Sequence, residues 1–264
     1  MLKDKVRAKK NLGQHFLVDL SIAKRIVDAL SDNQRNAVEI GPGMGVLTQY
    51  LIQRKTLNTK FIEIDGESVE YLRNHFPECN DQTLLQADFL HLRLDELFAG
   101  EKFSVIGNFP YNISSQIFFK ILEYKDLVPE TVCMLQREVA RRLASPPGNK
   151  DYGILSVFLQ AYYDIEYLFT VDEGVFNPPP KVKSGVIRLT RNSVAKLDCD
   201  EQLFRTVVKS TFNQRRKTLW NSVRTIQFDH EQIRNHPFMK LRPEQLSVAQ
   251  FVELTNVIEQ IQKQ

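Results

Sequence analysis

Short apolar runs alternate with amphipathic stretches along the chain up to residue 191. Apolar runs of strand length occupy 37–40, 61–65, 83–89, 103–107 and 131–136. Stretches with helical spacing of apolar positions occupy 46–54, 66–76, 114–123 and 137–144. Mostly apolar segments of this length are typical of buried parallel strands. Strands that alternate with helices therefore predict an α/β fold with a mostly parallel, Rossmann-like sheet.

The residues before this alternation predict a helix with a packed segment in front of it. Ile22, Ile26 and Leu30 fall on one helical face, and Ser21 is the expected cap. Segment 13–17 is too apolar for a free tail. We therefore expect it to pack over another part of the molecule.

The alternation of strand and helix stops near Asn192, and only helical periods follow. We therefore expect a Rossmann-like domain over 1–192, with a basic N-terminal arm, and a small all-α domain over 193–264. The last elements predicted for the first domain are a helix over 153–162 and strands over 165–171 and 182–189.

A glycine-rich turn follows the first strand of the predicted sheet. Gly41, Gly43 and Gly45 separate this strand from the next helix. Glycines let the backbone approach a ligand, and the helix N-terminus faces it. The spacing differs from the dinucleotide fingerprint, so a nucleoside without pyrophosphate is the better fit. A glycine-rich turn alone is a weak signal.

Acidic residues end the next two predicted strands. Glu63 and Asp65 follow the glycines by about twenty residues, where a ribose hydroxyl is usually bound. One of them can bind ribose while the other caps the helix that follows. Asp88 ends the third strand and can accept the amino hydrogen of an adenine ring. Its alternative role is a helix cap.

The fourth strand ends in Asn108-Phe109-Pro110-Tyr111, which suits methylation of an exocyclic amine on a nucleic-acid base. Such an amine is a poor nucleophile because its lone pair is delocalised into the ring. The Asn108 side-chain oxygen and the Pro110 carbonyl can each accept one amine hydrogen and so localise the lone pair. Tyr111 offers a face on which a flipped-out base can stack. The alternative is an ordinary Asn-Pro turn.

Four candidate ligand groups thus follow four successive strands: Gly41, Glu63, Asp88 and Asn108. The carboxyl ends of parallel strands meet at one edge of the sheet, where open α/β sheets bind ligands. The sequence therefore predicts one binding site at this edge.

Positive charge is concentrated in two blocks, although the net charge of the 264 residues is only +3. Residues 1–10 carry five Lys or Arg and one Asp, a net +4, so the remainder sums to −1. The second block lies within 209–224. Two such blocks predict contacts with RNA phosphates, and solvated basic faces are the alternative. The candidate contacts are Lys9, Lys10, Arg215, Arg216 and Lys217.

Several classes of protein are disfavoured by the composition. No apolar run approaches the length of a membrane span, and the first residues lack the apolar stretch of a signal peptide. Cys79, Cys133 and Cys199 are widely separated, and neither they nor the five His make a zinc-binding pattern. We therefore expect a reduced, cytoplasmic protein without a metal.

From about Lys9 onward the chain resembles the ribosomal RNA adenine dimethyltransferase family, and within it the bacterial small-subunit (16S) type. Together, the matching motifs are highly specific. They are EIGPGMGVLT (39–48), NFPYNIS (108–114), MLQREVARRL (134–143), YGILSV (152–157), FNPPPKV (176–182) and FNQRRKTL (212–219).

The resemblance implies a class I methyltransferase sheet and S-adenosylmethionine as methyl donor. It also implies two adjacent adenosines near the 3′ end of small-subunit rRNA as acceptors, within an assembling 30S particle, and a monomeric enzyme. The cofactor site it implies is His15, Leu17, Gly41, Gly43, Glu63, Asp88 and Asn108. The target base would be held by Asn108, Pro110, Tyr111 and Phe176.

Phe176 precedes three prolines, which exclude a helix interior or central strand and predict a stiff loop. This loop would present Phe176 to the base, and a core aromatic that anchors the loop is the alternative. The chain departs from the family pattern at Phe109, often Leu, at Lys183, usually Asp, and at His15, often Asn.

Three functions remain open from the sequence. The first is small-subunit rRNA adenine dimethylation. The second is methylation of another adenine, in large-subunit RNA or in DNA. The third is RNA binding without catalysis on the same fold. The complete Asn108 and Gly41 turns disfavour the third, whereas Asn112 and the segment 134–143, which includes the predicted helix, favour the first over the second.

Overall fold

The computed structural model describes residues 6–9 and 12–264 and divides the chain into two compact units. The first comprises the chain up to Ala140 and Asp164–Arg191. The second comprises Arg141–Tyr163 and Asn192–Gln264. The expected boundary near Asn192 coincides with the last crossing between the units, but 141–163 belongs to the second unit instead of the first. Whether each unit folds as a separate domain stays a prediction.

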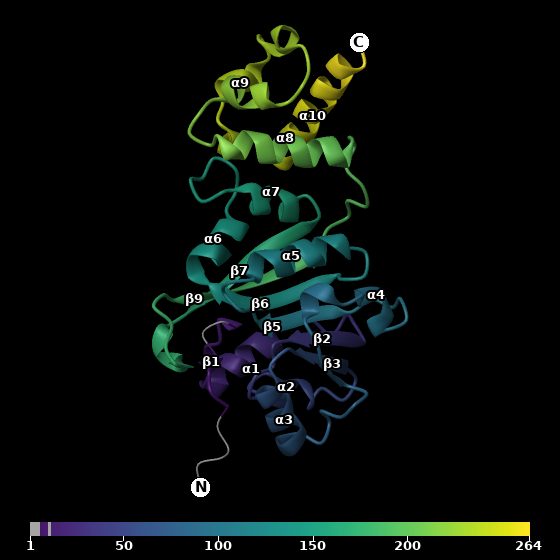
Figure 1. The fold of residues 1–264 in the computed structure, drawn as a ribbon, viewed down its shortest axis with the longest axis vertical. Helices are drawn as coiled ribbons and strands as arrows, with labels where there is room; N and C mark the ends of the chain where they lie inside the picture. Colours follow the sequence, from purple (N-terminus) through teal and green to yellow (C-terminus); the bar gives the residue numbers. More distant parts are fainter. Residues whose placement is uncertain (1–5, 10–11) are drawn as a thin grey trace. The chain divides into compact units, whose positions relative to one another are not determined.

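The first unit is built on a seven-stranded sheet with the order β4-β3-β2-β5-β6-β9-β7 (Figure 1). Neighbouring strands from β4 to β6 run parallel, and β9 is antiparallel to β6. The order reverses between β2 and β5, which opens a crevice at their carboxyl ends. The strands are β2 (Asn36–Ile40), β3 (Asn58–Glu63), β4 (Leu84–Gln86), β5 (Ser104–Asn108), β6 (Glu130–Gln136), β7 (Tyr163–Val171) and β9 (Ser184–Arg191).

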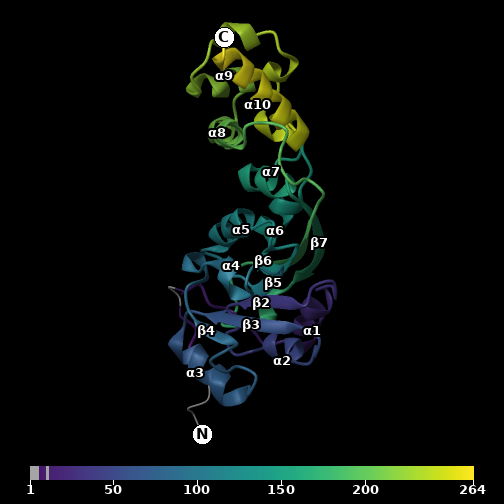
Figure 2. The same ribbon diagram turned by 90° about the vertical axis from the view of Figure 1, so that its right-hand side faces the viewer.

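Helices cover both faces of this sheet. Figure 2 shows α1 and α2 on one side of the strands and α4 and α5 on the other. The central strands are therefore apolar on both faces, and Val38, Val105 and Ile106 are fully buried. The predicted α/β fold is confirmed. The helices are α1 (Leu20–Asp28), α2 (Thr48–Leu51), α3 (Gly66–His75), α4 (Leu94–Leu97), α5 (Ser114–Glu123) and α6 (Arg137–Ala144), and α6 runs into the second unit.

The apolar N-terminal segment packs as predicted. Its two-residue strand β1 (Phe16–Leu17) pairs antiparallel with β8 (Phe176–Asn177), just after the 3₁₀ turn η3 (Glu173–Val175). The predicted cap of α1 was wrong. Asp19 accepts hydrogen bonds from the Ser21 and Ile22 amides at 2.8 and 3.1 Å, whereas Ser21 already lies inside the helix.

The second unit is helical, as predicted. Its elements pack through aromatic rings: Phe158 of α7 lies 6.2 Å from Phe204 of α8, and Phe212 of α8 lies 5.9 Å from Phe251 of α10. The first of these contacts explains why 141–163 groups with this unit. The helices are α7 (Ile154–Gln160), α8 (Glu201–Asn213), α9 (Leu219–Ser222) and α10 (Val248–Gln262). Short 3₁₀ turns η4 (Val223–Thr225), η5 (His230–Ile233), η6 (Pro237–Lys240) and η7 (Pro243–Gln245) connect α9 to α10.

Candidate active site

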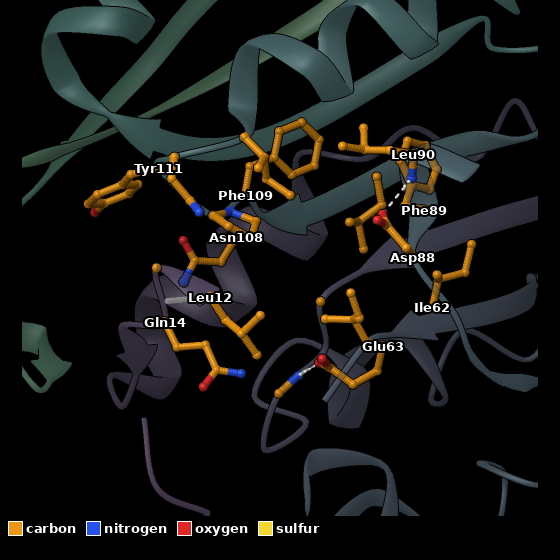
Figure 3. Close-up of a pocket in the computed structure, with 18 of the residues that line it drawn as sticks. Leu12, Gln14, Ile62, Glu63, Asp88, Phe89, Leu90, Asn108, Phe109 and Tyr111 are labelled. Atoms are coloured by element: carbon orange, nitrogen blue, oxygen red, sulfur yellow. Dashed lines mark hydrogen bonds between the residues drawn. The ribbon is translucent and has the colours of Figure 1, made fainter. Parts of the chain in front are cut away.

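A pocket of about 220 Å³ opens at the carboxyl ends of β2, β3, β4 and β5. All four strands contribute the residues that the sequence placed there, Gly41, Glu63, Asp88 and Asn108. Figure 3 shows Asn108 and Tyr111 on one side of the pocket, Asp88 on the other and Glu63 below Asp88. The predicted convergence at one edge of the sheet is confirmed.

The glycine turn after β2 brings backbone to the pocket wall. Gly41 and Gly43 have φ of +64° and +57°, in the left-handed region that favours glycine. A Cβ on Gly43 would lie 2.8 Å from the Phe16 ring, so a side chain there would also displace the N-terminal segment. The backbone amide of Gly43 donates to Glu63 Oε2 at 3.0 Å and fixes that carboxylate beside the turn.

The sequence predicts that one of Glu63 and Asp65 binds a ligand and the other caps the following helix, and the structure separates these two positions. Glu63 ends β3, lines the pocket and also accepts the Asp65 amide at 2.9 Å. Burial raises the pKa of Glu63, while these backbone N–H groups oppose the shift. Asp65 caps α3 by accepting the Glu67 amide at 3.2 Å and does not line this pocket. Glu63 is therefore the carboxylate available to a ligand.

Asp88 is both a cap and a pocket residue. Its Oδ1 accepts the Leu90 amide at 2.9 Å and caps the 3₁₀ turn η2 (Phe89–His91). His91 Nδ1 lies 3.0 Å from its Oδ2. The cap orients the carboxylate along the pocket wall without removing all its acceptor capacity. Both functions proposed for Asp88 are thus compatible.

Asn108 is held by the backbone of the N-terminal segment. Its Nδ2 donates to the His15 carbonyl at 3.0 Å, which sets the orientation of the amide. The amide nitrogen can only donate, so the side-chain oxygen is the atom that can accept a hydrogen from a ligand. Pro110 also lines the pocket, and its carbonyl accepts the Ile113 amide at 3.2 Å while retaining a second lone pair.

The Tyr111 ring is fixed by two contacts. Its hydroxyl lies 2.5 Å from Ser184 Oγ at the start of β9, and its ring centroid lies 5.6 Å from that of His15. Burial raises the pKa of Tyr111. His15 itself lines the pocket, and its Nδ1 lies 2.9 Å from the Pro178 carbonyl.

Two predicted site residues do not line this pocket. Leu17 and Phe176 are 3% and 4% exposed and belong to one hydrophobic cluster. Leu17 borders a smaller cavity of about 30 Å³ that is also lined by Gly41 and Asn108. Their roles toward cofactor and base stay predictions.

The predicted phosphate contacts differ in their surroundings. Lys9 Nζ lies 2.5 Å from Asp65 Oδ1, and Lys10 lies outside the described residues. Arg215 contacts the Lys150 carbonyl and lies 3.8 Å from Glu244, whereas Arg216 and Lys217 are exposed. Their role in RNA binding stays a prediction.

Three residues near the site escaped the sequence analysis. Glu39 of β2 is buried and accepts Thr48 Oγ1 at 2.7 Å. An acid inside an apolar strand is a signal that could have identified it. Ser184 and Gln14 had no such signal, because their importance depends on contacts with Tyr111 and Asp65, which are distant in sequence.

The lining of the pocket combines hydrogen-bond acceptors with apolar side chains, as a nucleoside would require. Carboxylates stand at two of the strand ends, and apolar side chains lie between them. Ile64 lines the pocket and is 50% exposed, so a flat ring could cover it.

Among the described residues, no group of three or more His, Cys, Asp or Glu side chains could hold a metal ion. The expected independence from metal stays a prediction.

A family profile described as "Ribosomal RNA adenine dimethylase" matches residues 5–260. The chain belongs to this family.

Members of the family resemble the chain over nearly its whole length. The "Ribosomal RNA small subunit methyltransferase A" of Porphyromonas gingivalis is 59% identical over 261 residues, which cover 97% of this chain and 99% of that protein. The protein of the same name from Phocaeicola vulgatus is 56% identical over 255 residues, which cover 96% and 90%.

Solved structures share the fold. A dimethyladenosine transferase from Plasmodium falciparum aligns with a TM-score of 0.77 at 21% identity, covering 93% of this chain and 98% of that one. The 23S rRNA methyltransferase ErmE aligns with a TM-score of 0.68 at 26% identity, covering 91% and 99%. The class I methyltransferase fold expected from the sequence is confirmed.

Two departures from the family pattern have local explanations. Phe109 is buried, and its ring lies 5.7 Å from that of Phe118, so the larger side chain is absorbed by the core. Lys183 Nζ lies 2.5 Å from Asp172 Oδ1, which pairs its positive charge within the first unit and raises the pKa of Lys183.

Proposed function

We propose that this protein methylates the N6 amine of two adjacent adenosines near the 3′ end of small-subunit rRNA and produces N6,N6-dimethyladenosine. Membership of the rRNA adenine dimethylase family supports the reaction. The names of relatives at 56–59% identity support the small subunit as the source of the substrate. We further propose a monomeric cytoplasmic enzyme that acts on an assembling 30S particle. Within the described residues, no helix is long and apolar enough to cross a membrane.

S-adenosylmethionine fits the hydrogen-bond acceptors and apolar side chains that line the pocket and, when bound, supplies an electrophilic methyl group. Glu63 would accept hydrogen bonds from the ribose, and Asp88 would accept one from the adenine amine of the cofactor. The Gly41–Gly43 turn would let the cofactor approach the backbone. His15 would contact the carboxylate of the cofactor and Leu17 would pack at its edge, as the family resemblance implies.

The observation that carries the proposal is the hydrogen bond from Asn108 Nδ2 to the His15 carbonyl at 3.0 Å. With the amide held in this way, the Asn108 oxygen would accept one hydrogen of a substrate amine, and the carbonyl of Pro110, which also lines the pocket, would accept the other. Holding the amine hydrogens on these two acceptors keeps the nitrogen lone pair out of the ring π system, where it can attack an electrophile. The Tyr111 ring, held by Ser184, would stack on the flipped base.

This arrangement also accounts for two transfers and no third. The unmodified amine has two hydrogens, and one remains after the first methylation to orient the nitrogen again. After the second methylation none remains, so the lone pair returns to the ring. The cation formed at each step is acidic enough to lose its proton to water, so no dedicated general base is required.

The alternatives receive less support. ErmE, a 23S rRNA methyltransferase, has 26% identity, against 56–59% for the small-subunit relatives. A binding protein without catalysis would not need the Asn108 amide to be oriented toward the pocket.

The test is incubation of small-subunit rRNA with S-adenosylmethionine, followed by mass spectrometry of the nucleosides. We expect dimethyladenosine at two adjacent positions, with the monomethyl form only as an intermediate. Asn108→Ala should slow both transfers by roughly a hundred- to a thousand-fold, since it removes one preorganised polar contact.

The RNA affinity of Asn108→Ala is the control for substrate binding, and it should equal that of the wild type. A product that stops at one methyl under excess cofactor would contradict dimethylation. Near-normal turnover by the Ala variant would remove Asn108 from the mechanism. Methylation of large-subunit RNA alone would establish the second hypothesis.

A further inference from the structure

Asp65 ties two residues near the N-terminus to the end of β3. Its Oδ1 lies 2.5 Å from Lys9 Nζ, and its Oδ2 accepts Gln14 Nε2 at 3.2 Å. Gln14 Oε1 in turn accepts the Lys9 backbone amide at 2.8 Å, so the three residues form a closed ring of contacts. The Asp65 side chain is only 1% exposed, although it carries a negative charge. A buried carboxylate of this kind depends on its partners.

Leu12–Phe16 form one wall of the pocket. We name Lys9 together with Leu12–Leu17 the N-terminal cover. Leu12, Gln14 and Phe16 line the pocket directly. Beyond the ring at Asp65, the cover is held at the target-base side. There the His15 carbonyl accepts Asn108 Nδ2, and β1 pairs with β8. The cover therefore runs from the strand that carries Glu63 to the residues that would hold the base.

We propose that Lys9, Gln14 and Asp65 are positioning residues that clasp the N-terminal cover over the cofactor pocket. Lys9 would then act in cofactor retention, and not as the phosphate contact that its position in a basic block predicts. The inference rests on the proposed function, because it takes S-adenosylmethionine as the occupant of the pocket.

The electrostatics of Lys9 favour this role. Its ammonium group faces two carboxylates, Asp65 at 2.5 Å and Glu67 at 3.2 Å. Because these two carboxylates offset its positive charge, Lys9 should attract an RNA phosphate less strongly than an unpaired lysine would. Burial alone would raise the pKa of Asp65, but hydrogen bonds from Lys9 and Gln14 outweigh it and hold the pKa below its usual value. Asp65 therefore stays ionised and keeps attracting Lys9.

The contacts among Lys9, Gln14 and Asp65, which we call the clasp, would raise the affinity for cofactor by increasing the fraction of molecules in which the N-terminal cover is closed. If only the closed form binds cofactor well, the apparent Kd equals the intrinsic Kd divided by the closed fraction. Removing Lys9 leaves the Asp65 carboxylate buried without its cation, which favours opening. We expect the Kd for cofactor to rise roughly 5- to 150-fold, the usual range for coupling between two sites.

The test is calorimetric titration of the full chain with S-adenosylmethionine in the absence of RNA. Lys9→Ala and Asp65→Asn should each weaken binding, and Asn at 65 can still cap α3. The double variant should be little weaker than either single one, because both remove the same contact. Lys9→Arg should restore tight binding. Lys24→Ala is the matched control, since Lys24 pairs with exposed Asp28 on α1 and lies outside the pocket lining.

Kinetics separate the clasp from a general structural role. We expect KM for the cofactor to rise in Lys9→Ala, with kcat at saturating cofactor and RNA affinity equal to those of Lys24→Ala. Unchanged cofactor affinity with weaker RNA binding would overturn the proposal and make Lys9 a phosphate contact. If Asp65→Asn fails to fold, Lys9→Ala and Lys9→Arg decide alone.

Failure of this inference and failure of the proposed function give different results. If the wild-type protein does not bind S-adenosylmethionine, the proposed function fails and the clasp fails with it. If the wild-type protein binds and methylates while the Lys9 variants match it, only the clasp is overturned.

Discussion

At the scale of single residues, two neighbouring carboxylates have different roles because the strand that precedes them ends at the first of the two. Glu63 and Asp65 are two residues apart and would share a face if β3 continued. The strand ends at Glu63, so Glu63 lines the pocket while Asp65 turns to cap α3 and bind Lys9. The sequence could predict that one acid binds and the other caps. It could not decide which, because that depends on the last residue of the strand.

Phe176 is the residue for which the structure most changes the expected outcome of a substitution. It belongs to the hydrophobic cluster that also contains Leu17 and Val171. We therefore expect Phe176→Ala to lower the free energy of unfolding by about 3–5 kcal/mol, as for other buried aromatic truncations. Denaturant unfolding of the purified variant measures this change. Phe119→Ala on α5, where the ring is 43% exposed, is the control.

The stacking role of Phe176 makes a different prediction for the same protein sample. Loss of one base stack costs about 1–3 kcal/mol and would slow methylation without a large loss of stability. Wild-type stability with slow methylation would therefore assign Phe176 to the base. A large loss of stability, with normal activity at a temperature where the variant is folded, would assign it to the core.

At the scale of elements, the sequence predicted what is local and missed what depends on distant pairing. The bounds of α5 and α6 agree with the pattern, because their apolar faces repeat with helical spacing. In contrast, β1 and β8 are only two residues long and pair Phe16 with Asn177 and Leu17 with Phe176, far apart in sequence, so neither leaves a periodic signal. The helix predicted over 46–54 is the shorter α2, with irregular turns on both sides.

Strand β2 contains an acid that makes stability depend on pH. Burial raises the pKa of Glu39 to about 8, so the folded protein keeps this carboxyl protonated over a range in which the unfolded chain ionises it. The folded state then binds more protons than the unfolded state between the ordinary glutamate pKa of 4.5 and about 8. The contribution of Glu39 to stability must therefore fall as the pH rises through this window.

Glu39→Gln should remove this dependence, because glutamine is neutral and can still accept the Thr48 hydroxyl. We expect the variant to melt higher than wild type at pH 8, by about 2–4 °C for each kcal/mol gained. The difference should shrink toward pH 5. Thermal melts across this range measure it, and a difference that stays constant from pH 5 to pH 8 would contradict a raised pKa of Glu39 in the folded protein.

At the scale of the whole molecule, the sequence identified the charged blocks but not which charges are already paired. Lys9 is engaged by Asp65 and Glu67, and Arg215 by Glu244 and the Lys150 carbonyl. Each partner of Arg215 lies far from it in sequence, so a count of charges along the chain overstates what is available to RNA. Arg216 and Lys217 are exposed and remain the best candidates of the second block.

These two residues should carry most of the salt dependence that the second block contributes. RNA affinity is expected to fall with rising salt through counterion release, and each phosphate contact adds about 0.7–0.9 to the slope of log affinity against log salt. Arg216→Ala with Lys217→Ala should therefore flatten the slope by about 1.5. Arg215→Ala should change it little, because its guanidinium is occupied. Binding titrations with small-subunit rRNA over a range of salt concentrations measure the slopes of the wild type, the double variant and Arg215→Ala.

The control for lost charge is Lys24→Ala with Lys55→Ala, which removes two exposed lysines of the first unit. If this pair flattens the slope as much as the Arg216 and Lys217 pair, the effect reports net charge and not a contact surface. If neither pair changes the slope, the second block is a solvated face. Cofactor affinity should stay at the wild-type value in every one of these variants, because no substituted residue lines the pocket that would hold it.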